Sequence, residues 1–388
     1  MDQQQAVPKK KKKKLRRYYD YSLLFTIIFL TVFGLIMIYS SSSYSAQIDG
    51  KAPSYFMMRQ MYIALFGFAV MLVISKMNYH FFAKFAGLAL AVSYLCMFLV
   101  NFTPLGIARN GKKRWLGYGN TTILQPAELV KITIILVMAV MITKMGKKIN
   151  EWRSWGIVTI AVLPLALLVT MNNLSSGIII CGIPVVMMFI ANKRKWPFVL
   201  FITAVAAVIM FALPIAVALE EVGILQPYQL ERILVWKNPE AYPQDGGYQV
   251  LQGLYAIGSG GLLGKGLGQS IQKLSFLPEP QNDMIFAIIC EELGLFGAIM
   301  VIFMFMFMIY RFMRIAGSAP DILGSFIVIG VMAQIAIQVI LNIAVVTSVI
   351  PNTGVTLPFI SYGGTSVLFL MVEMGMVLSV SNSILLER

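Results

Sequence analysis

Long apolar runs, separated by short polar segments, recur along almost the whole chain. Most are close to the roughly 20 residues that a helix needs to cross the hydrocarbon core of a bilayer. The pattern predicts ten membrane-spanning helices. They cover residues 21–42, 58–76, 80–101, 126–143, 155–171, 176–192, 197–218, 282–310, 320–349 and 363–384. We therefore predict an all-α integral membrane protein, a bundle of ten transmembrane helices in one domain at 21–388, preceded by a basic tail at 1–20.

Basic residues between the predicted spans indicate the orientation, because cytoplasmic loops carry an excess of Lys and Arg. An unbroken lysine run, Lys9 to Lys14, precedes the first span. Three further clusters fall on the same side once ten spans are threaded: Lys144, Lys147, Lys148 and Arg153, then Lys193, Arg194 and Lys195, then Arg311 and Arg314. We expect both termini in the cytoplasm. For the lysine run, a tail that touches anionic lipid is favoured over a nucleic-acid site.

Composition supports the same class of protein. Charged residues make up 12% of the chain, about half of the ~25% that is typical of soluble domains. The three cysteines, Cys96, Cys181 and Cys290, all lie in predicted spans, so a disulfide framework is not expected. The single histidine, His80, lies at a cytoplasmic span end, which excludes His-centred triads and His-rich metal sites on the outer face.

One loop breaks the charge pattern. Between the third and fourth spans, four basic residues lie close together on the face that should carry few of them. They are Arg109, Lys112, Lys113 and Arg114, followed by Trp115. An anionic partner at the outer headgroup level would explain the cluster, because Arg and Lys pair with phosphate through charge-assisted hydrogen bonds. A solvated loop that contacts lipid headgroups without specificity is an alternative that the residues leave open.

The longest segment outside the predicted spans is residues 219–281, which should form one large extracellular loop between the seventh and eighth spans. A loop of this length is usually functional or disordered. Its apolar residues suggest that it packs on the bundle or dips into it, where irregular backbone is tolerated if it lines a cavity. Its glycines permit a close approach of the backbone to a ligand. A nucleotide site at Lys265 is rejected, because the P-loop spacing is absent.

A few ionisable residues fall within the apolar runs, where burial is costly. Glu128 and Lys131 are three positions apart, so they share a helix face and are able to pair. Glu291 and Glu292 lie about 12 Å deeper than Asp283 along the eighth span, at 1.5 Å per residue. For these four residues we favour a structural or cavity role.

Asp283 differs from them, because it lies where the large loop meets the eighth span. A carboxylate at that boundary stays in contact with water on one side and faces a lipid-borne substrate on the other. The alternative is a local role, in which Asn282 or Asp283 caps the helix and complements its dipole.

Three groups of residues carry a resemblance that covers essentially the whole chain after the basic tail. The first group is Tyr248-Gln249, Ala256 to Gly261, Gly264-Lys265-Gly266, Leu277-Pro278-Glu279, Asp283 to Ala287 and Glu291 to Gly294. The second is Arg114-Trp115, Gln125 to Leu129 and Lys131. The third is Asn342-Ile343, Pro351 to Gly354 and Leu357 to Ser366. In this order and on these membrane faces, the chain resembles the SEDS family (shape, elongation, division and sporulation), whose members include FtsW, RodA and SpoVE.

The resemblance implies a function. Members of that family are ten-span peptidoglycan glycosyltransferases of the bacterial cytoplasmic membrane, some of them at the division septum. They polymerise lipid II, an undecaprenyl-pyrophosphate disaccharide-pentapeptide, at the outer leaflet. They act in cell division or cell shape with a class B penicillin-binding protein, which crosslinks the strands, and with other divisome or elongasome membrane proteins. The resemblance places the family's essential aspartate at Asp283, and its loop arginine and tryptophan at Arg114 and Trp115.

The chain also departs from the usual family pattern. Gln281-Asn282-Asp283 stands where His-Thr-Asp is usual, so a His-assisted proton relay is not expected and the role of base falls on Asp283 alone. Ala127 replaces a frequent Ser, and Asn172 to Ser175 replace a Pro-Asp-Leu-Gly-like segment. The Gln281 variant is more similar to the Gram-positive division and sporulation branch than to RodA.

Sugar transfer from a pyrophosphate donor needs a base, stabilisation of the leaving charge, and alignment. Asp283 is the predicted base, with a pKa raised by partial burial. The leaving charge should fall on basic side chains or on a bound Mg²⁺ or Mn²⁺ at the pyrophosphate. The predicted substrate-binding residues are Arg109, Lys112, Lys113, Arg114, Trp115, Lys265, Glu279 and Ser361. For Trp115, stacking on a sugar ring and a place in the aromatic belt both stay open.

Two other functions stay open on the sequence. A transporter that flips lipid II across the membrane would also use ten helices, buried charges and a basic outer patch, but it would need a polar route to the cytoplasmic face. A scaffold that recruits the transpeptidase would tolerate replacement of Asp283. Polymer formation by the purified protein separates these functions.

Overall fold

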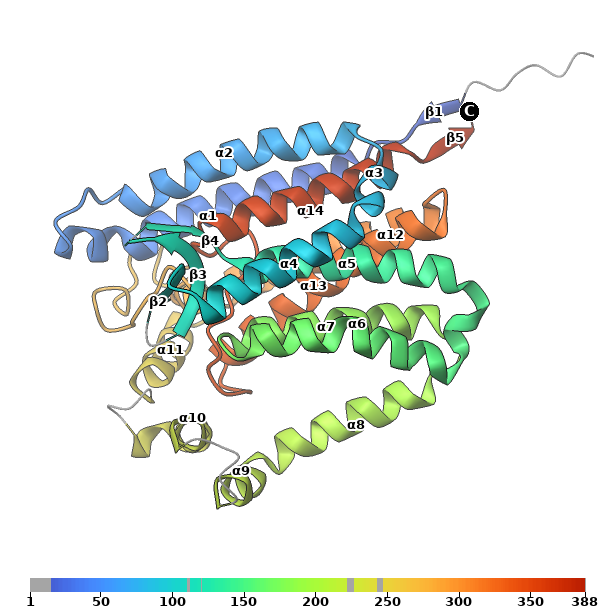
Figure 1. Ribbon diagram of the computed structural model, residues 1–388. Helices are drawn as coiled ribbons and strands as arrows, with labels where there is room; N and C mark the ends of the chain where they lie inside the picture. Colours follow the sequence, from blue (N-terminus) through green and yellow to red (C-terminus); the bar gives the residue numbers. More distant parts are fainter. Residues whose placement is uncertain (1–14, 110–111, 120, 222–226, 243–246, 388) are drawn as a thin grey trace, which may run out of the picture.

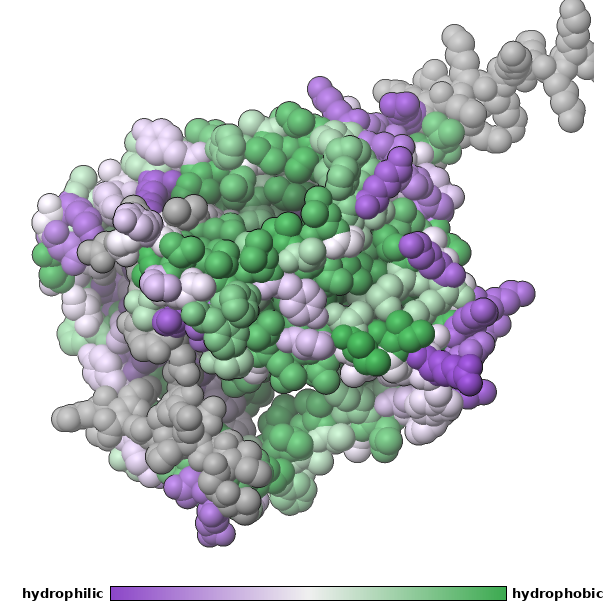
Figure 2. All heavy atoms as spheres, viewed as in Figure 1, coloured by the Kyte–Doolittle hydropathy of each residue, from purple (hydrophilic) through white to green (hydrophobic). Residues whose placement is uncertain are grey.

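The computed structural model describes residues 15–109, 112–119, 121–221, 227–242 and 247–387. Most of the long helices run side by side as a bundle (Figure 1). Apolar side chains cover the middle of the visible face, and hydrophilic ones gather toward the two ends (Figure 2). That distribution fits a bundle that crosses a membrane, whose lipid accepts an apolar middle and whose interfaces accept polar ends.

Eight helices of the described residues are long and apolar enough to cross a membrane. They are α1 (Tyr21–Ile48), α2 (Tyr55–Lys76), α5 (Pro126–Met145), α6 (Trp152–Thr170), α7 (Leu174–Ala191), α12 (Ile285–Ser318), α13 (Ile322–Val346) and α14 (Thr365–Asn382). A ninth candidate is a pair bent by 77°, α8 (Trp196–Met210) with α9 (Ala212–Glu221). The predicted span at 80–101 is divided between α3 (Tyr79–Lys84) and the shorter apolar helix α4 (Ala86–Phe102). Every predicted span is therefore mainly helical, while the number of membrane crossings stays a prediction.

Two small antiparallel sheets make the all-α prediction wrong in part. Between α4 and α5 lie three strands in the order β2-β3-β4. They are β2 (Gly106–Arg109), β3 (Lys112–Tyr118) and β4 (Thr121–Leu124). A second sheet pairs β1 (Leu15–Arg17) with β5 (Leu385–Glu387) and brings the two ends of the described chain together. The basic cluster consequently lies on a sheet and not on an irregular loop.

The centre of the bundle is formed by α5, α13 and α14. In their most apolar windows 61%, 67% and 67% of the residues are buried, against 28% for α2. α13 packs against α5, α7, α12 and α14. α8, in contrast, buries only Phe198 within the described structure. The central helices α5, α13 and α14 thus carry buried polar residues such as Glu128, Gln334 and Glu373.

The predicted large loop at 219–281 contains helices and dips into the bundle, as expected. Its described part holds α10 (Pro227–Lys237), the short 3-10 helix η2 (Pro239–Ala241) and α11 (Gly247–Gly260). An irregular stretch at 261–284 follows, which we call the re-entrant segment. Its backbone meets α12 well inside that helix: Lys265 N–H donates to Glu291 O at 3.0 Å, and Gly266 N–H donates to Glu292 O at 2.9 Å.

Candidate active site

Asp283 lies near the end of the re-entrant segment, just before α12 begins at Ile285. Met284 is the N-cap residue of that helix and makes no side-chain capping hydrogen bond. The Asn282 side chain donates to Glu279 Oε2 at 2.8 Å. Neither Asn282 nor Asp283 is therefore the N-cap residue, while complementation of the helix dipole by the Asp283 charge stays open.

The electrostatic surroundings of Asp283 favour its protonated form. The carboxyl is half-buried, and its pKa is raised from 3.8 to about 6, chiefly because burial disfavours the charged form. The negative charge of Glu279 also contributes to the rise, whereas the positive charge of Arg114 and nearby backbone N–H groups oppose it. Because burial outweighs these opposing influences, the group is a stronger base than an ordinary aspartate and is still ionised at neutral pH.

A side chain from α13 holds the backbone at Asp283. Asn342 donates from Nδ2 to Asp283 O at 2.8 Å and to Val355 O at 2.7 Å. The loop between α13 and α14 thereby closes against the re-entrant segment. Within that loop, a Cβ added at Gly354 would lie 3.8 Å from Asp283 Oδ2, and the φ of this glycine is +69°. The carboxyl therefore lies directly beside the backbone of the loop that precedes α14.

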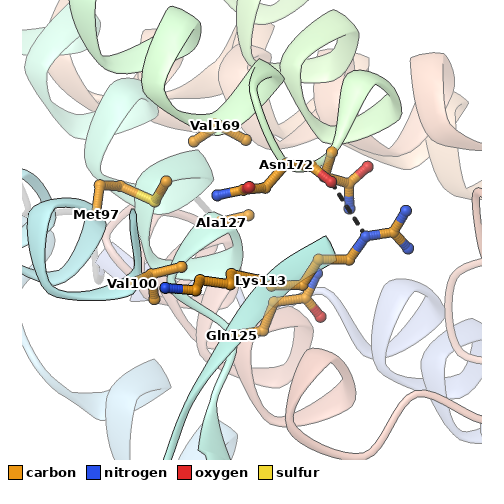
Figure 3. A pocket seen from close by; sticks show the side chains of 9 residues that line it. Met97, Val100, Lys113, Gln125, Ala127, Val169 and Asn172 are labelled. Atoms are coloured by element: carbon orange, nitrogen blue, oxygen red, sulfur yellow. Dashed lines mark hydrogen bonds between the residues drawn. The ribbon is translucent and has the colours of Figure 1, made fainter. Parts of the chain in front are cut away.

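A small pocket beside β3 gathers basic and amide side chains (Figure 3). Lys113 and Arg114 come from β3, and Asn172 comes from the turn between α6 and α7. Arg114 Nε donates to Asn172 O at 3.2 Å, and the Asn172 amide donates to Asn101 of α4. The other lining residues are Met97, Val100, Gln125, Ala127, Val169 and Asn173. The space enclosed is about 10 Å³, which is room for about one water molecule, so in this conformation a phosphate would contact these two cations only at the edge of the pocket.

The structure places the remaining residues of the basic cluster only in part. Arg109 and Lys112 pair across β2 and β3, but their side chains lie outside the described part of the structure. Trp115 pairs with Ile107 in the same sheet and is half-buried. Its role in stacking on a sugar or in the aromatic belt stays a prediction.

Two further predicted substrate residues differ in their accessibility. Glu279 is exposed, and its positive φ of 47° marks a tight turn next to Asp283. Ser361 is 2% exposed, and its Oγ accepts a hydrogen bond from Leu357 N–H at 2.8 Å. In this conformation the Ser361 hydroxyl stabilises the loop before α14 and is not open to a substrate.

Two ion pairs with buried carboxylates connect the re-entrant segment to α12. Lys265 Nζ lies 2.7 Å from Glu291 Oε1, and Lys273 Nζ lies 2.8 Å from Glu292 Oε1. Both carboxylates are fully buried. Ser40 of α1 donates to Glu292 Oε1 at 2.6 Å, so the second pair also reaches another helix. These contacts fit the structural role predicted for the two glutamates. Lys265, which was predicted to bind phosphate, forms an ion pair with Glu291 in this structure.

Further donors surround the carboxylate of Glu291. Ile271 N–H donates to it at 3.1 Å, Gln272 N–H donates at 3.3 Å, and Ser270 Oγ donates as well. A buried carboxylate is tolerated only when it is paired and hydrogen-bonded in this way. We call the set formed by Lys265, Ser270, Lys273, Glu291 and Glu292 the ion-pair latch. Lys273 and Ser270 were not predicted from the sequence, because both lie in an irregular stretch with no periodicity to show their direction.

A second charge cluster lies in the centre of the bundle. Lys131 Nζ is 2.7 Å from Glu128 Oε2, so the pairing expected from their spacing is present. Glu373 of α14 is 1% exposed and interacts electrostatically with both charges. It accepts a hydrogen bond from Gln334 Nε2 of α13 at 2.8 Å. Glu373 was not predicted from the sequence, although its place in an apolar run is the criterion that singled out Glu128.

The described residues do not build a cage for the predicted Mg²⁺ or Mn²⁺. No group of three or more His, Cys, Asp or Glu side chains that could hold a metal ion occurs among them. A cation at this site would be held chiefly by the pyrophosphate of a substrate. Its participation stays a prediction, and no step below depends on it.

Comparison with known protein sequences gives matches along nearly the whole chain. The family described as cell cycle protein, which covers FtsW, RodA and SpoVE, matches residues 21–384. The chain is 37% identical to stage V sporulation protein E of Bacillus subtilis over 359 residues, 92% of this chain and 95% of that protein. It is 36% identical over 365 residues to the probable peptidoglycan glycosyltransferase FtsW of Trichlorobacter lovleyi, 94% of this chain and 93% of that protein. The FtsW protein of B. subtilis, with the same description, is 35% identical over 368 residues, 94% and 90% of the two chains.

Solved structures share the fold. A chain from a study of polymerization and crosslinking by a peptidoglycan synthase complex is similar with a TM-score of 0.75 and 24% identity, covering 94% of this chain and 97% of that one. The rod shape determining protein RodA of Thermus thermophilus is similar with a TM-score of 0.66 and 21% identity, covering 94% and 96%. At these identities the likeness is one of fold.

Proposed function

The chain belongs to the cell cycle protein family of FtsW, RodA and SpoVE, and we propose that it is a peptidoglycan glycosyltransferase that polymerises lipid II in cell division or cell shape. Relatives that carry this activity in their names match over 93% and 90% of their own lengths. The matched region therefore includes nearly everything that those proteins contain.

The half-buried carboxyl of Asp283 is the observation that carries the proposal. In the reaction, Asp283 accepts the proton of a sugar hydroxyl, whose oxygen forms a bond to the anomeric carbon of a lipid-linked sugar. The bond between that carbon and the pyrophosphate oxygen breaks. Because the pKa of Asp283 is about 6 and not 3.8, the carboxylate holds the transferred proton about 100-fold more tightly than an ordinary aspartate would. The raised pKa thus matches the demand on a general base.

The departing pyrophosphate needs positive charge, which Lys113 and Arg114 supply beside the small pocket that they line. Arg114 is close enough to Asp283 to influence its pKa, so base and cation belong to one site. The neighbouring Arg109 and Lys112 extend the same sheet and are proposed to join them. Charge-assisted hydrogen bonds to phosphate oxygens stabilise the negative charge as it develops.

We place this site at the outer face of the bacterial cytoplasmic membrane, in a ten-span bundle with both termini in the cytoplasm. The pairing of β1 with β5 supports an even number of crossings, because it joins the two ends of the described chain. In Figure 1 these strands and the connection from α5 to α6 lie at one end of the bundle, and β2, β3, β4 and α11 lie at the other. The connection from α5 to α6 carries Lys147 and Lys148, as a cytoplasmic loop should.

The partners proposed for this enzyme are lipid II, a class B penicillin-binding protein that crosslinks the new strands, and other divisome or elongasome membrane proteins. The relatives named FtsW and stage V sporulation protein E favour a place at a septum. A glycan polymer without crosslinks has no mechanical strength, so coupling to a transpeptidase follows from the reaction itself.

The test uses full-length protein in liposomes that contain lipid II. Wild-type protein should form glycan polymer, and Asp283→Asn should form none while it stays inserted and folded. Asp49→Asn is the matched control. Asp49 is an exposed aspartate at the end of α1 that pairs with Lys51 at 3.1 Å, so its replacement should leave polymer formation unchanged.

The alternative functions give different outcomes in the same liposomes. Polymer from Asp283→Asn at the wild-type rate would refute the role of base. Movement of labelled lipid II between leaflets without polymer would favour a transporter. A wild-type protein that neither polymerises nor moves lipid II, yet binds its transpeptidase, would favour a scaffold.

A further inference from the structure

Several buried acceptor atoms have no hydrogen-bond donor, and these atoms are clustered along one path through the bundle. Eight buried side-chain atoms of the described residues have no hydrogen-bond partner, and seven of them belong to the end of the re-entrant segment, to α13, to α14 and to the loop between those two helices. Three are on Gln281 and Asn282, which directly precede Asp283 in the chain, and on Thr353, the neighbour of Gly354. The other four belong to Gln334, Gln338, Asn342 and Glu373. Buried polar atoms are nearly always satisfied, so such a cluster calls for donors from outside the chain.

α13 arranges three of these side chains in one row. Gln334, Gln338 and Asn342 are spaced by four residues, which places them on the same helix face over about 12 Å. They are 0%, 5% and 0% exposed. The row begins at Asn342, which donates to the Asp283 carbonyl, and ends at Gln334, which donates to Glu373.

The hydrogen bonds fix which atom of each amide remains unpaired. Gln334 Nε2 donates to a carboxylate, and Gln338 Nε2 donates to Thr356 O at 2.9 Å. Asn342 Nδ2 donates to two carbonyls. Turning any of these amides would set its oxygen against another acceptor. The unpaired atoms are therefore the oxygens, and each of them requires a donor.

Water is the donor that fits this row. The pentapeptide and sugars of a substrate would reach only the three atoms outside α13 and α14, because Gln334 and Glu373 lie deeper in the bundle. Water supplies two donors to each pair of neighbouring acceptors and is the usual partner of buried polar groups. Glu373 offers a carboxyl at the inner end, beside Gln334 and the charges of Lys131 and Glu128.

We propose that internal water molecules bind along this face of α13 and form a proton-exchange path between Asp283 and Glu373. This path rests on the proposed function, in which Asp283 receives a proton from the sugar hydroxyl. The O–H bond of the Asp283 carboxyl breaks, the proton passes through the water molecules, and an O–H bond forms at Glu373. The water molecules are regenerated, and Asp283 is again a carboxylate. After the product leaves, the proton returns by the same path and departs through Asp283 to the outer solution.

Such a path has a use while substrates cover the outer mouth of the site. A bound glycan and a lipid pyrophosphate separate Asp283 from bulk water at the moment when its proton must leave. A second carboxyl behind Asp283 accepts the proton without opening the site. The charged groups that face Asp283 are Glu279 and Arg114, and those that face Glu373 are Lys131 and Glu128.

The kinetic test uses full-length protein in liposomes with lipid II. Glu373→Gln removes the inner proton acceptor at constant shape, and Gln338→Leu removes one link of the row. Both variants should lower kcat several-fold, leave KM near the wild-type value and alter the solvent deuterium isotope effect. Asn192→Leu is the matched control, because Asn192 is 2% exposed but bonds Ile149 O and Arg194 N–H at the far end of α7. It should lower thermal stability without altering the isotope effect.

Wild-type kcat and an unchanged isotope effect in both variants would overturn the path. A cryo-electron microscopy map provides a readout that does not need activity. Density for water within hydrogen-bond distance of the oxygens of Gln334 and Gln338 would support the path. A map that resolves buried water elsewhere but none in this row would overturn it. Absence of polymer from wild-type protein would instead count against the proposed function, and the map would still decide the path.

Discussion

Lys265 Nζ lies 2.7 Å from Glu291 Oε1, and this ion pair joins the re-entrant segment to the helix that begins directly after Asp283. Glu291 is fully buried, whereas the side chain of Lys265 is 29% exposed. The chain leaves the bundle core at Gly260, returns to it at Lys265 and reaches Asp283 only afterwards. The position of the Asp283 carboxyl therefore depends on contacts made deep in the bundle.

Lys265→Met should destabilise the protein strongly. The change leaves the Glu291 carboxylate buried without its cation, a situation that costs about 3–5 kcal/mol for buried pairs. The double variant Lys265→Met/Glu291→Gln should recover part of that loss, because no uncompensated charge remains. Thermal and denaturant unfolding in detergent measures both values.

Lys51→Met is the control for this comparison. Lys51 pairs with Asp49 at 3.1 Å, but the two side chains are 41% and 54% exposed. Exposed pairs contribute about 0–1 kcal/mol, so this variant should unfold almost as the wild type does. An equally small effect for Lys265→Met would show that the latch does not hold the segment.

Asp283→Asn should raise stability at neutral pH while it abolishes activity. The pKa of Asp283 is about 6 in the folded protein against an ordinary value of 3.8, so the folded state binds this proton more tightly than the unfolded state does. Stability from this group is complete below pH 3.8 and is lost as the pH rises toward 6. The amide has no charge to bury and avoids that loss.

Unfolding curves over a pH series test this prediction. The stability gap between Asp283→Asn and wild type should be widest at neutral pH and should close in acid. Asp49→Asn, at an exposed position, should show no such gap. A gap that is independent of pH would mean that burial of the ionised Asp283 is not its cause.

The pH dependence of polymerisation should respond to the two charges near Asp283. The base acts when it is ionised, so the rate should rise as the pH rises through about 6. Glu279 raises the pKa of Asp283, and Arg114 lowers it. Glu279→Gln should therefore move the acid limb of the profile to lower pH, and Arg114→Ala should move it to higher pH.

Opposite shifts are the informative result, because a general loss of structure would not move the two profiles in different directions. Arg114→Ala should also weaken binding of lipid II through the loss of a phosphate contact. Shifts in the same direction, or no shifts, would mean that the charges of Glu279 and Arg114 do not set the pKa of the base.

The helices were predicted well because the length and the apolar composition of each run directly indicate a helix that lies in lipid. The sheet around Trp115 was not predicted, although Asn110-Gly111 between two short runs is a common hairpin signature. Its strands are only four to seven residues long, and basic residues dominate the middle one. A polar sequence of this kind gives little periodicity from which a strand is recognised.

Asp283 was predicted from its place at a loop boundary, but the residues that hold its surroundings in place were not predicted. Ser40 and Glu292 are 252 residues apart, and Asn342 and Asp283 are 59 apart. No local pattern links such residues, since their contact arises from the packing of helices. Glu128 and Lys131 were predicted to pair because a spacing of three residues on one helix places them on the same face.

Gly264→Ala should disrupt the entry of the re-entrant segment into the bundle. Gly264 has a φ of +77°, and a Cβ added there would lie 2.2 Å from Glu292 O. The contact is with backbone, so no side-chain rotation relieves it. Left-handed backbone strain and overpacking together should cost about 2–5 kcal/mol. Displacement of this turn would also pull Lys265 away from Glu291 and shift Asp283, so polymerisation should fall together with stability.

Gly258→Ala is the matched control within the same glycine-rich stretch. Gly258 lies inside α11, and an added Cβ would meet nothing within 4 Å. Alanine in a helix is favoured over glycine by about 0.5–1 kcal/mol, so this variant should be as stable as wild type or slightly more stable. Equal tolerance of alanine at both positions would mean that the segment does not approach α12 as closely as the hydrogen bond from Gly266 N–H to Glu292 O requires, and the depth assigned to the latch would be wrong.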